Sequence, residues 1–108
     1  MKRLIIAATL LAATNAHAEF WSVSKLREML AEEPGVRSGA AHGYIIGVHD
    51  AGEGVIHCSP DTAKAGDVVT VVRMYIDAVP QRPSKSADAV VFDALKARWP
   101  CPNKGQGI

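Results

Sequence analysis

Hydrophobic residues recur at helical spacing in four segments along the chain. The first segment begins at the candidate capping residues Ser22 and Ser24 and ends before Pro34-Gly35. Its apolar positions are Val23, Leu26, Met29 and Leu30. The second segment covers about residues 38–49 and carries apolar side chains between regularly spaced glycines. Both patterns predict helices, because the apolar positions fall on one side of a 3.6-residue period.

The third and fourth segments each carry a broad apolar face. The third runs from Asp67 to Val79, and Ser59-Pro60-Asp61 before it predicts its capping residue and first turn. Its valines also suit a β-strand, but its length and its end at Pro80 favour a helix. The fourth begins near Ser84 or Ser86 and ends at Trp99-Pro100. The two faces consist of Val68, Val69, Val72, Tyr75, Ile76 and Val79, and of Ala87, Val90, Val91, Ala94, Leu95 and Arg98.

The order of these segments predicts an all-α fold, a small bundle of about four helices. Residues 50–57 contain two glycines and are predicted to form a loop. The chain shows neither a hairpin signal nor an internal repeat. A length of 108 residues fits a single small domain, which we place at residues 19–108.

The first residues have the pattern of a secretory signal peptide. A basic start is followed by the apolar run Leu4 to Ala13 and by Ala16-His17-Ala18, a small-x-small cleavage signature. A membrane-spanning helix needs about 20 apolar residues, and this run is shorter. We therefore expect residues 1–18 to be removed after Ala18, and we expect an exported product without stable membrane insertion.

The charge balance limits the classes of partner. The chain has 12 Lys and Arg against 11 Asp and Glu, with a net charge of +1. Nucleic-acid binding relies on an extended basic field, which this composition does not supply. Nucleic acid is therefore not expected as a partner.

The two cysteines, Cys58 and Cys101, predict one disulfide. Export brings both thiols into an oxidising compartment, and no third cysteine competes. Closing this loop stabilises the fold by roughly 4 kcal/mol in the chain-entropy model. With Cys58 near the start of the third helix, the bond would clamp the third and fourth helices antiparallel. The alternative, a nucleophilic Cys58 beside His57, requires a thiol that stays reduced next to an available Cys101, and no catalytic residue is predicted.

Sequence motifs for metal binding, phosphate binding or catalysis are weak or missing. His42, His49 and His57 are spaced seven and eight residues apart, without the tight pairs typical of zinc sites. His42 and His49 can share a helix face near Asp50 and Glu53. The chain has neither a phosphate-binding glycine loop nor a carboxylate pair for glycoside cleavage. We therefore expect no metal, no cofactor and no enzymatic activity.

Gly39, Gly43 and Gly47 recur at every fourth residue of the second segment. A glycine inside a helix costs on the order of 1 kcal/mol relative to alanine. Two explanations offset this cost: tight packing of another helix within the bundle, or a face for self-association.

Four short motifs in order resemble one known family. They are Gly43 to Asp50 (GYIIGVHD), Cys58-Ser59-Pro60, Val71 to Pro80 with Tyr75 and Ile76, and Trp99-Pro100-Cys101. Together they resemble the Rap/Tai family of type VI secretion immunity proteins over residues 24–101. The resemblance implies a periplasmic helical protein that binds a peptidoglycan-cleaving amidase toxin delivered by neighbouring cells, often as a homodimer. Members commonly carry a second cysteine pair, and the corresponding stretches here, residues 31–33 and 40–42, contain none.

Other classes stay open beside this one. The HdeA-type periplasmic acid-stress chaperones are also small, helical and bridged by one disulfide, with a similar glycine-tyrosine helix. Their bridge begins in the first helix region, however, whereas Cys58 and Cys101 link later segments. The cysteine positions therefore favour the immunity family. A scaffold role in an envelope machine has no motif for or against it.

Under this resemblance we expect inhibition by steric blockade, in which a loop occupies the toxin's cleft. The exposed candidates are residues 50–57 and 81–85. The expected contact residues are Asp50, Glu53, His57 and Arg82. The alternative for each is an ordinary solvated side chain.

Overall fold

The computed structural model describes residues 20–103, and this part is entirely α-helical in its regular structure. The predicted signal peptide, residues 1–18, lies outside the described residues. The helices are α2 (Val23–Leu30), α3 (Val36–Gly52), α4 (Ala65–Ala78) and α5 (Ala87–Arg98). The predicted fold class, a small four-helix bundle with one disulfide, is confirmed. Within the described residues, no helix is both long and apolar enough to span a bilayer.

Two predicted boundaries were wrong. Helix α3 continues to Gly52, so Asp50 lies on a helix and not in a loop. Helix α4 begins only at Ala65, and Ser59-Pro60 remains in the connection before it. The first turn of α4 is instead held by Asp67, whose Oδ2 accepts a hydrogen bond from Lys64 N at 2.9 Å. Ser59 hydrogen-bonds elsewhere, as described below.

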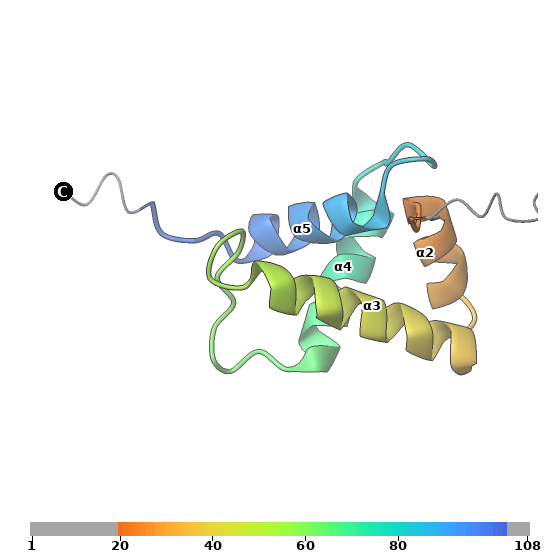
Figure 1. Ribbon diagram of the computed structural model, residues 1–108, viewed down its shortest axis with the longest axis horizontal. Helices are drawn as coiled ribbons and strands as arrows, with labels where there is room; N and C mark the ends of the chain where they lie inside the picture. The colour runs from red at the N-terminus through yellow and green to blue at the C-terminus, as the bar shows by residue number, and fades with distance from the viewer. Residues whose placement is uncertain (1–19, 104–108) are drawn as a thin grey trace, which may run out of the picture.

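The helices form a compact arrangement around α5. Helices α3 and α5 lie next to each other and run in the same direction, and α4 crosses behind them (Figure 1). Helix α2 stands at the end where α3 and α5 begin, and packs against both. Each helix therefore contributes one face to a shared core.

The buried core matches the predicted apolar faces closely. All four apolar positions of α2 are buried, and α4 and α5 bury the residues predicted for them, apart from the half-buried Tyr75 and the more exposed Val79 and Arg98. Helix α3 contributes only Ala41 and Ile45 as fully buried apolar side chains. The core consists of Val23, Leu26, Met29, Leu30, Ala41, Ile45, Val68, Val69, Val72, Ile76, Ala87, Val90, Val91, Ala94 and Leu95.

Helix α5 is held at its beginning by backbone hydrogen bonds to the segment before α2. Val23 N donates to Lys85 O at 2.7 Å, and Ala87 N donates to Trp21 O at 2.8 Å. These bonds form a short antiparallel contact around Ser22 and Ser86. The starts of α2 and α5 are thereby fixed to each other.

The end of α5 is held by the disulfide between Cys58 and Cys101, whose Cα atoms are 4.8 Å apart. Cys58 N also donates to Trp99 O at 2.8 Å. The predicted pairing is confirmed, but the expectation that it clamps the third and fourth helices antiparallel was wrong. Because α4 begins only at Ala65, Cys58 lies just after α3, and the disulfide ties the C-terminal ends of α3 and α5.

Candidate functional site

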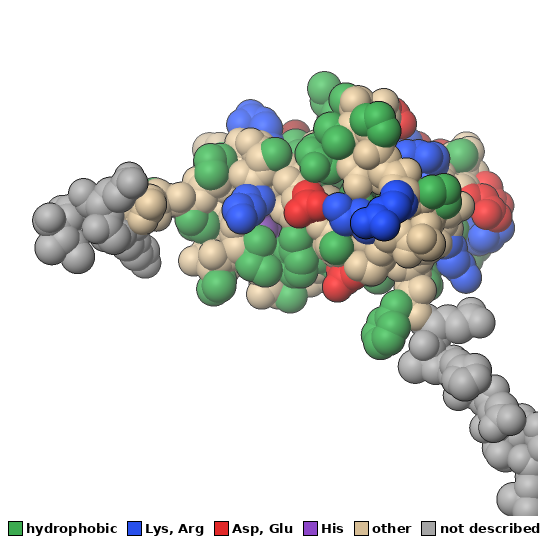
Figure 2. Space-filling model, turned by 90° about the horizontal axis from the view of Figure 1, so that it is seen from above, with side chains coloured by type: hydrophobic (Ala, Val, Ile, Leu, Met, Phe, Trp, Pro, Cys, Tyr) green, Lys and Arg blue, Asp and Glu red, His purple; other side chains and the backbone are tan. Residues whose placement is uncertain are grey.

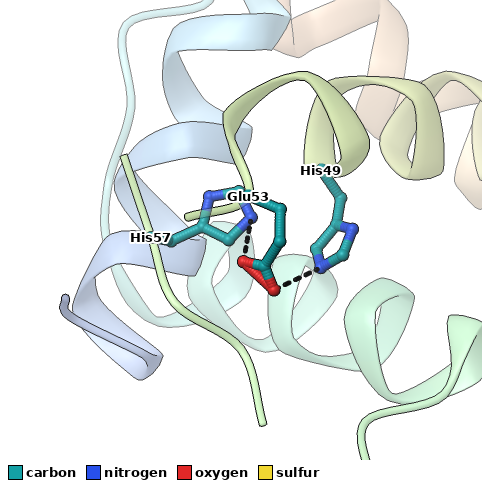
Figure 3. A group of neighbouring side chains, drawn as sticks. All are labelled: His49, Glu53 and His57. Atoms are coloured by element: carbon teal, nitrogen blue, oxygen red, sulfur yellow. Dashed lines mark ion pairs between the residues drawn. The ribbon is translucent and has the colours of Figure 1, made fainter. Parts of the chain in front are cut away.

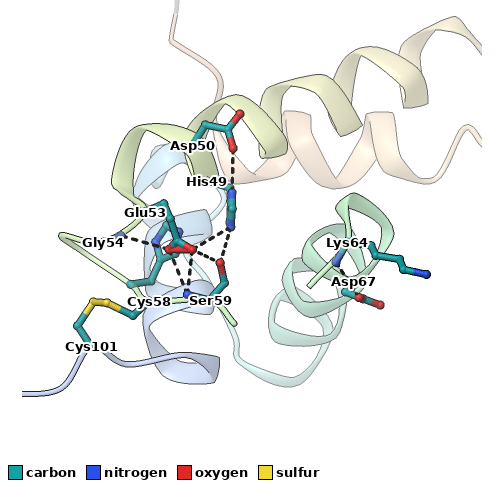
Figure 4. A network of polar contacts seen from close by, with 10 residues as sticks. His49, Asp50, Glu53, Gly54, Cys58, Ser59, Lys64, Asp67 and Cys101 are labelled. Atoms are coloured by element: carbon teal, nitrogen blue, oxygen red, sulfur yellow. Dashed lines mark hydrogen bonds and ion pairs between the residues drawn. A yellow bond between two sulfur atoms is a disulfide. The ribbon is translucent and has the colours of Figure 1, made fainter. Parts of the chain in front are cut away.

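A cluster of polar side chains lies where α3 ends and the chain turns back toward the end of α5 (Figure 4). It consists of His49, Asp50, Glu53, His57 and Ser59. Residues 53–59, which we call the 53–59 loop, supply three of these side chains. The loop turns at Gly54, whose φ of +83° is in the left-handed region that favours glycine. Gly54 N donates to His57 O at 2.7 Å and closes the turn.

Gly52 allows this turn to lie directly against α5. A Cβ atom at this position would be 2.5 Å from Cε1 of Phe92 and 3.1 Å from Cε1 of His57. Real Cβ atoms do not approach side chains that closely. The absence of a side chain at Gly52 therefore sets the distance between the end of α3 and α5.

The carboxylate of Glu53 accepts hydrogen bonds from both sides of the loop. Ser59 N donates to its two oxygens at 3.0 and 3.1 Å, and Gly54 N donates to Oε2 at 3.2 Å. The Ser59 hydroxyl also donates to Oε1. The Ser59 hydroxyl bond is the main cause that lowers the pKa of Glu53, with further contributions from the backbone donors and His57. The ionised carboxylate is thus the favoured form.

His49 lies between Asp50 and Ser59. Its Nδ1 is 3.0 Å from Asp50 Oδ1, and its Nε2 is 3.0 Å from Ser59 Oγ. A carboxylate oxygen only accepts, so the proton of the neutral ring belongs on Nδ1. This assignment leaves the lone pair of Nε2 directed toward Ser59 and Glu53.

His57 is buried without a hydrogen bond. Its side chain is 0% exposed, and neither ring nitrogen has a hydrogen-bond partner within the described residues. Its Nε2 is 3.6 Å from Glu53 Oε2, which is longer than a hydrogen bond. The ring lies between His49 and Phe92, with ring centroids 4.9 and 6.4 Å away. Burial, and secondarily His49, lowers the pKa of His57, so its neutral form is favoured.

The structure separates the four predicted contact residues. The side chain of Asp50 is 71% exposed and that of Glu53 is 35% exposed, so both reach the surface beside the 53–59 loop. His57 is fully buried, and the expectation that it contacts a partner directly was therefore wrong. Arg82 is exposed on the connection before α5, whereas the 53–59 loop lies at the other end of that helix (Figure 1). A small contact surface with a partner therefore cannot include both Arg82 and the 53–59 loop.

Sequence reasoning missed Val55 and the role of Ser59. Val55 is an apolar side chain that is 82% exposed in the 53–59 loop, and Ser59, expected only as a capping residue, hydrogen-bonds to Glu53. His49, which the sequence places near Asp50 and Glu53, completes the polar cluster. A signal for the cluster was present, because His49, Glu53 and His57 are spaced four residues apart. For Val55, the signal was an apolar residue inside a predicted glycine-containing loop.

The glycines of α3 face outward. A Cβ atom at Gly39, Gly43 or Gly47 would meet nothing within 4 Å in the described part of the protein. No other helix of the bundle therefore packs on these positions, and the explanation by internal packing is wrong. Self-association stays a prediction.

The face seen in Figure 2 mixes side chains of opposite charge. Lys and Arg lie next to Asp and Glu, and hydrophobic side chains are scattered between them. On the described part of this face, the charges form no extended field of one sign. The mixture of side chains on this face therefore does not by itself mark a binding surface.

Fold and surface together define a small, disulfide-bonded helical domain with an exposed loop that is held by hydrogen bonds and by the disulfide. The chain belongs to the family of Rap1a immunity proteins, whose family model matches residues 7–101. The resemblance predicted from the motifs is thereby confirmed. No curated protein sequence matches the chain. Membership of an immunity family means that its partner is a toxin effector.

Proposed function

We propose that this protein is a periplasmic immunity protein of type VI secretion that binds a peptidoglycan-degrading amidase effector. Three observations support this proposal: the family match, the N-terminal pattern of a signal peptide, and the motifs shared with the Rap/Tai family. The disulfide between Cys58 and Cys101 agrees with an oxidising compartment such as the periplasm.

The observation that carries the proposed contact is the exposure of Val55 on a loop that is otherwise firmly held. Val55 is 82% exposed, while Glu53 and the disulfide at Cys58 fix the loop on both sides of it. An apolar side chain on a preorganised loop loses little conformational entropy on binding. A valine side chain that fills a pocket of the toxin also favours binding, because its apolar surface is removed from water.

In this mechanism the 53–59 loop fills the cleft of the toxin and excludes the cell-wall peptide. Val55 supplies the apolar contact, and the exposed carboxylate of Asp50 accepts hydrogen bonds from the toxin. Glu53 and His57 keep the loop in shape from inside. The chain performs no catalysis in this step. Arg82 lies outside the contact and acts as a solvated charge.

The test begins with the effector. The exported, oxidised protein is used as bait in extracts of its own bacterium, and the captured partner is assayed on purified peptidoglycan with mass spectrometry of the released fragments. We expect one stoichiometric partner that cleaves peptide amide bonds and loses this activity when bound. A partner that cleaves glycosidic bonds would contradict the amidase assignment. Many unrelated clients captured only in acid would instead identify an acid-stress chaperone.

The loop assignment is tested with variants of the immunity protein. Val55→Glu places a charge in the apolar contact, and we expect it to weaken binding on the order of 100-fold, with a smaller loss for Asp50→Ala. Arg82→Ala is the control, because it removes an exposed side chain at the other end of α5. Equal inhibition by all three variants, or a larger loss for Arg82→Ala, would place the contact elsewhere.

We further propose that two copies associate through the outer face of α3. Gly39, Gly43 and Gly47 leave its backbone open to close approach, and no contact among residues 20–103 offsets their cost to the helix. The flanking Val36 is 92% exposed, which adds apolar area to the same helix. A second copy of α3 is the occupant that meets this narrow face with an identical one.

Self-association is measured by sedimentation equilibrium of the exported protein. We expect a dimer for the natural chain and a monomer for Gly43→Leu, because a leucine side chain keeps the two helices apart. Gly66→Leu is the control, since Gly66 on α4 is also surrounded by open space. A natural chain that stays monomeric at every concentration would remove the dimer from the proposal.

A further inference from the structure

We propose that His49, Glu53 and His57 form a binding site for one divalent transition-metal ion, with zinc as the expected occupant (Figure 3). The site lies at the end of α3 and in the 53–59 loop. The proposal rests on the arrangement of these side chains and is independent of the identity of the toxin.

The three side chains are already spaced almost as zinc ligands. One ligand atom from each lies within 4.8 Å of the others. His49 Nε2 is 3.9 Å from Glu53 Oε1, and His57 Nε2 is 3.6 Å from Glu53 Oε2. In a tetrahedral zinc site, with bonds of about 2.0–2.2 Å, neighbouring ligand atoms are about 3.4 Å apart. Small side-chain rotations therefore bring the three groups around one ion.

The second observation is the unpartnered state of His57. A buried polar side chain is nearly always hydrogen-bonded, and leaving it without a partner destabilises the folded protein. His57 is fully buried, and both of its ring nitrogens lack hydrogen bonds within the described residues, although Nε2 faces Glu53. A metal ion between Nε2 and the carboxylate gives this nitrogen the partner it lacks.

The donor set determines the class of metal. Two imidazole nitrogens and one carboxylate are typical ligands of zinc, with a fourth position left for water or another group. Calcium and magnesium prefer oxygen ligands throughout. Cobalt, nickel and copper accept the same donors, so selectivity among these ions depends on geometry and availability.

Neighbouring groups orient two of the three ligands for metal binding. Asp50 accepts from Nδ1 of His49 and leaves the Nε2 lone pair free. Hydrogen bonds of this kind orient the ligands of metal sites. Gly54 N and Ser59 N donate to Glu53 and keep its carboxylate in place. On binding, the metal bond at His49 Nε2 replaces its 3.0 Å contact with the Ser59 hydroxyl oxygen.

Solvent reaches this site from one side. His57 is at the buried end, whereas the side chains of His49 and Glu53 are 15% and 35% exposed. An ion therefore enters past Glu53, and a water molecule there completes the coordination. The bound ion would join the last turn of α3 to the 53–59 loop next to the disulfide.

A second histidine cluster in the same bundle provides the control. His42, also on α3, has its Nε2 2.8 Å from Glu33 Oε1, but Arg73 Nη2 lies 2.6 Å from the same oxygen. The guanidinium already occupies the position that a cation would need, and it repels one. His42 is therefore expected to take no part in metal binding.

The experiment uses the exported, oxidised protein after treatment with a chelator. Zinc is titrated by calorimetry, and cobalt is titrated by visible absorption, because four-coordinate cobalt has a distinct, intense spectrum. We expect one zinc per chain, a four-coordinate cobalt spectrum, and no heat with calcium or magnesium. Glu53→Gln, His49→Gln and His57→Phe should each lower zinc affinity by on the order of 100-fold or more, because each removes a ligand. His42→Gln should leave the affinity unchanged.

The outcomes that overturn the site are equally specific. The site is overturned if the natural chain forms no stoichiometric zinc complex. It is also overturned if both Glu53→Gln and His49→Gln keep full zinc affinity. Loss of binding in His42→Gln would place the ion at the other cluster. His57→Phe keeps a ring of similar size beside Phe92, and circular dichroism checks its fold. Should it fail to fold, the two exposed-side variants decide the question by themselves.

Discussion

Both ends of α5 are held to the rest of the protein by backbone hydrogen bonds, but only one end also carries a covalent bond. At its beginning, backbone hydrogen bonds join residues 21–23 to residues 85–87. At its end, the disulfide between Cys58 and Cys101 reinforces the backbone hydrogen bond from Cys58 N to Trp99 O, and Gly52 packs closely on Phe92 in the middle of the helix. The exposed loop with Val55 lies at this second end.

This difference shows how a small domain can keep one surface loop rigid. A backbone hydrogen bond contributes about 1 kcal/mol and opens locally when the segment frays. A disulfide remains closed during such fluctuations because it is covalent, and it also stabilises the fold by restricting the unfolded chain. The loop proposed to bind the toxin is therefore at the end of α5 that opens least.

The largest effect is expected from removal of the disulfide. Replacing both Cys58 and Cys101 by Ser should lower the free energy of unfolding by roughly 2–5 kcal/mol. The measurement is urea unfolding, and the control is the natural chain with a reductant, which should lose a similar amount. An unchanged urea midpoint would show that this end of α5 does not depend on the covalent bond.

A smaller effect is expected at Gly52. Gly52→Ala places a methyl group 2.5 Å from Cε1 of Phe92, so we expect a loss of about 1–3 kcal/mol from overpacking. Gly43→Ala is the matched substitution on the same helix. Its methyl group meets open space, and higher helix propensity should stabilise the fold by up to about 1 kcal/mol. Thermal unfolding of dilute samples distinguishes the loss of stability at Gly52 from the gain at Gly43. A change of stability in the same direction for both variants would contradict the described packing.

The beginning of α5 is tested through the start of α2, to which it is bonded. Ser22 caps α2, and its Oγ accepts a hydrogen bond from Lys25 N at 3.2 Å. Ser22→Ala should cost about 0.5–2 kcal/mol. Amide hydrogen exchange should become faster at Val23 and Ala87, which bond across this end, and stay unchanged at Cys58. Faster exchange at Cys58 as well would mean that the two ends open together.

The smallest effect concerns the ion pair between Lys85 and Asp93, whose Nζ and Oδ2 are 2.9 Å apart. Both side chains are partly exposed, so Lys85→Met should cost no more than about 1 kcal/mol. The loss should shrink further at high salt, because ions screen exposed pairs. A loss as large as that of the disulfide variant would reverse the comparison between the two ends.

Part of the candidate site was predictable from residue type. Asp50 and Glu53 were expected at the surface near a loop, and the structure exposes both. The burial of His57 was not predictable, because it depends on Phe92, which comes from a helix far away in the sequence. The distance between Arg82 and the 53–59 loop depends likewise on the position of α5.

The four helices, their apolar faces, the cysteine pairing and the family were all predictable from residue order, because they depend on local periodicity and on short motifs. The pattern did not predict where α3 stops, since Gly52 looks like a loop residue but lies in the last turn of α3, packed against Phe92. Three features depend on the three-dimensional packing: the disulfide joins α3 to α5, the α3 glycines face outward, and His57 is enclosed beside Glu53. Apolar periodicity defines which side of a helix is buried, but the side chains of other helices decide what it is buried against.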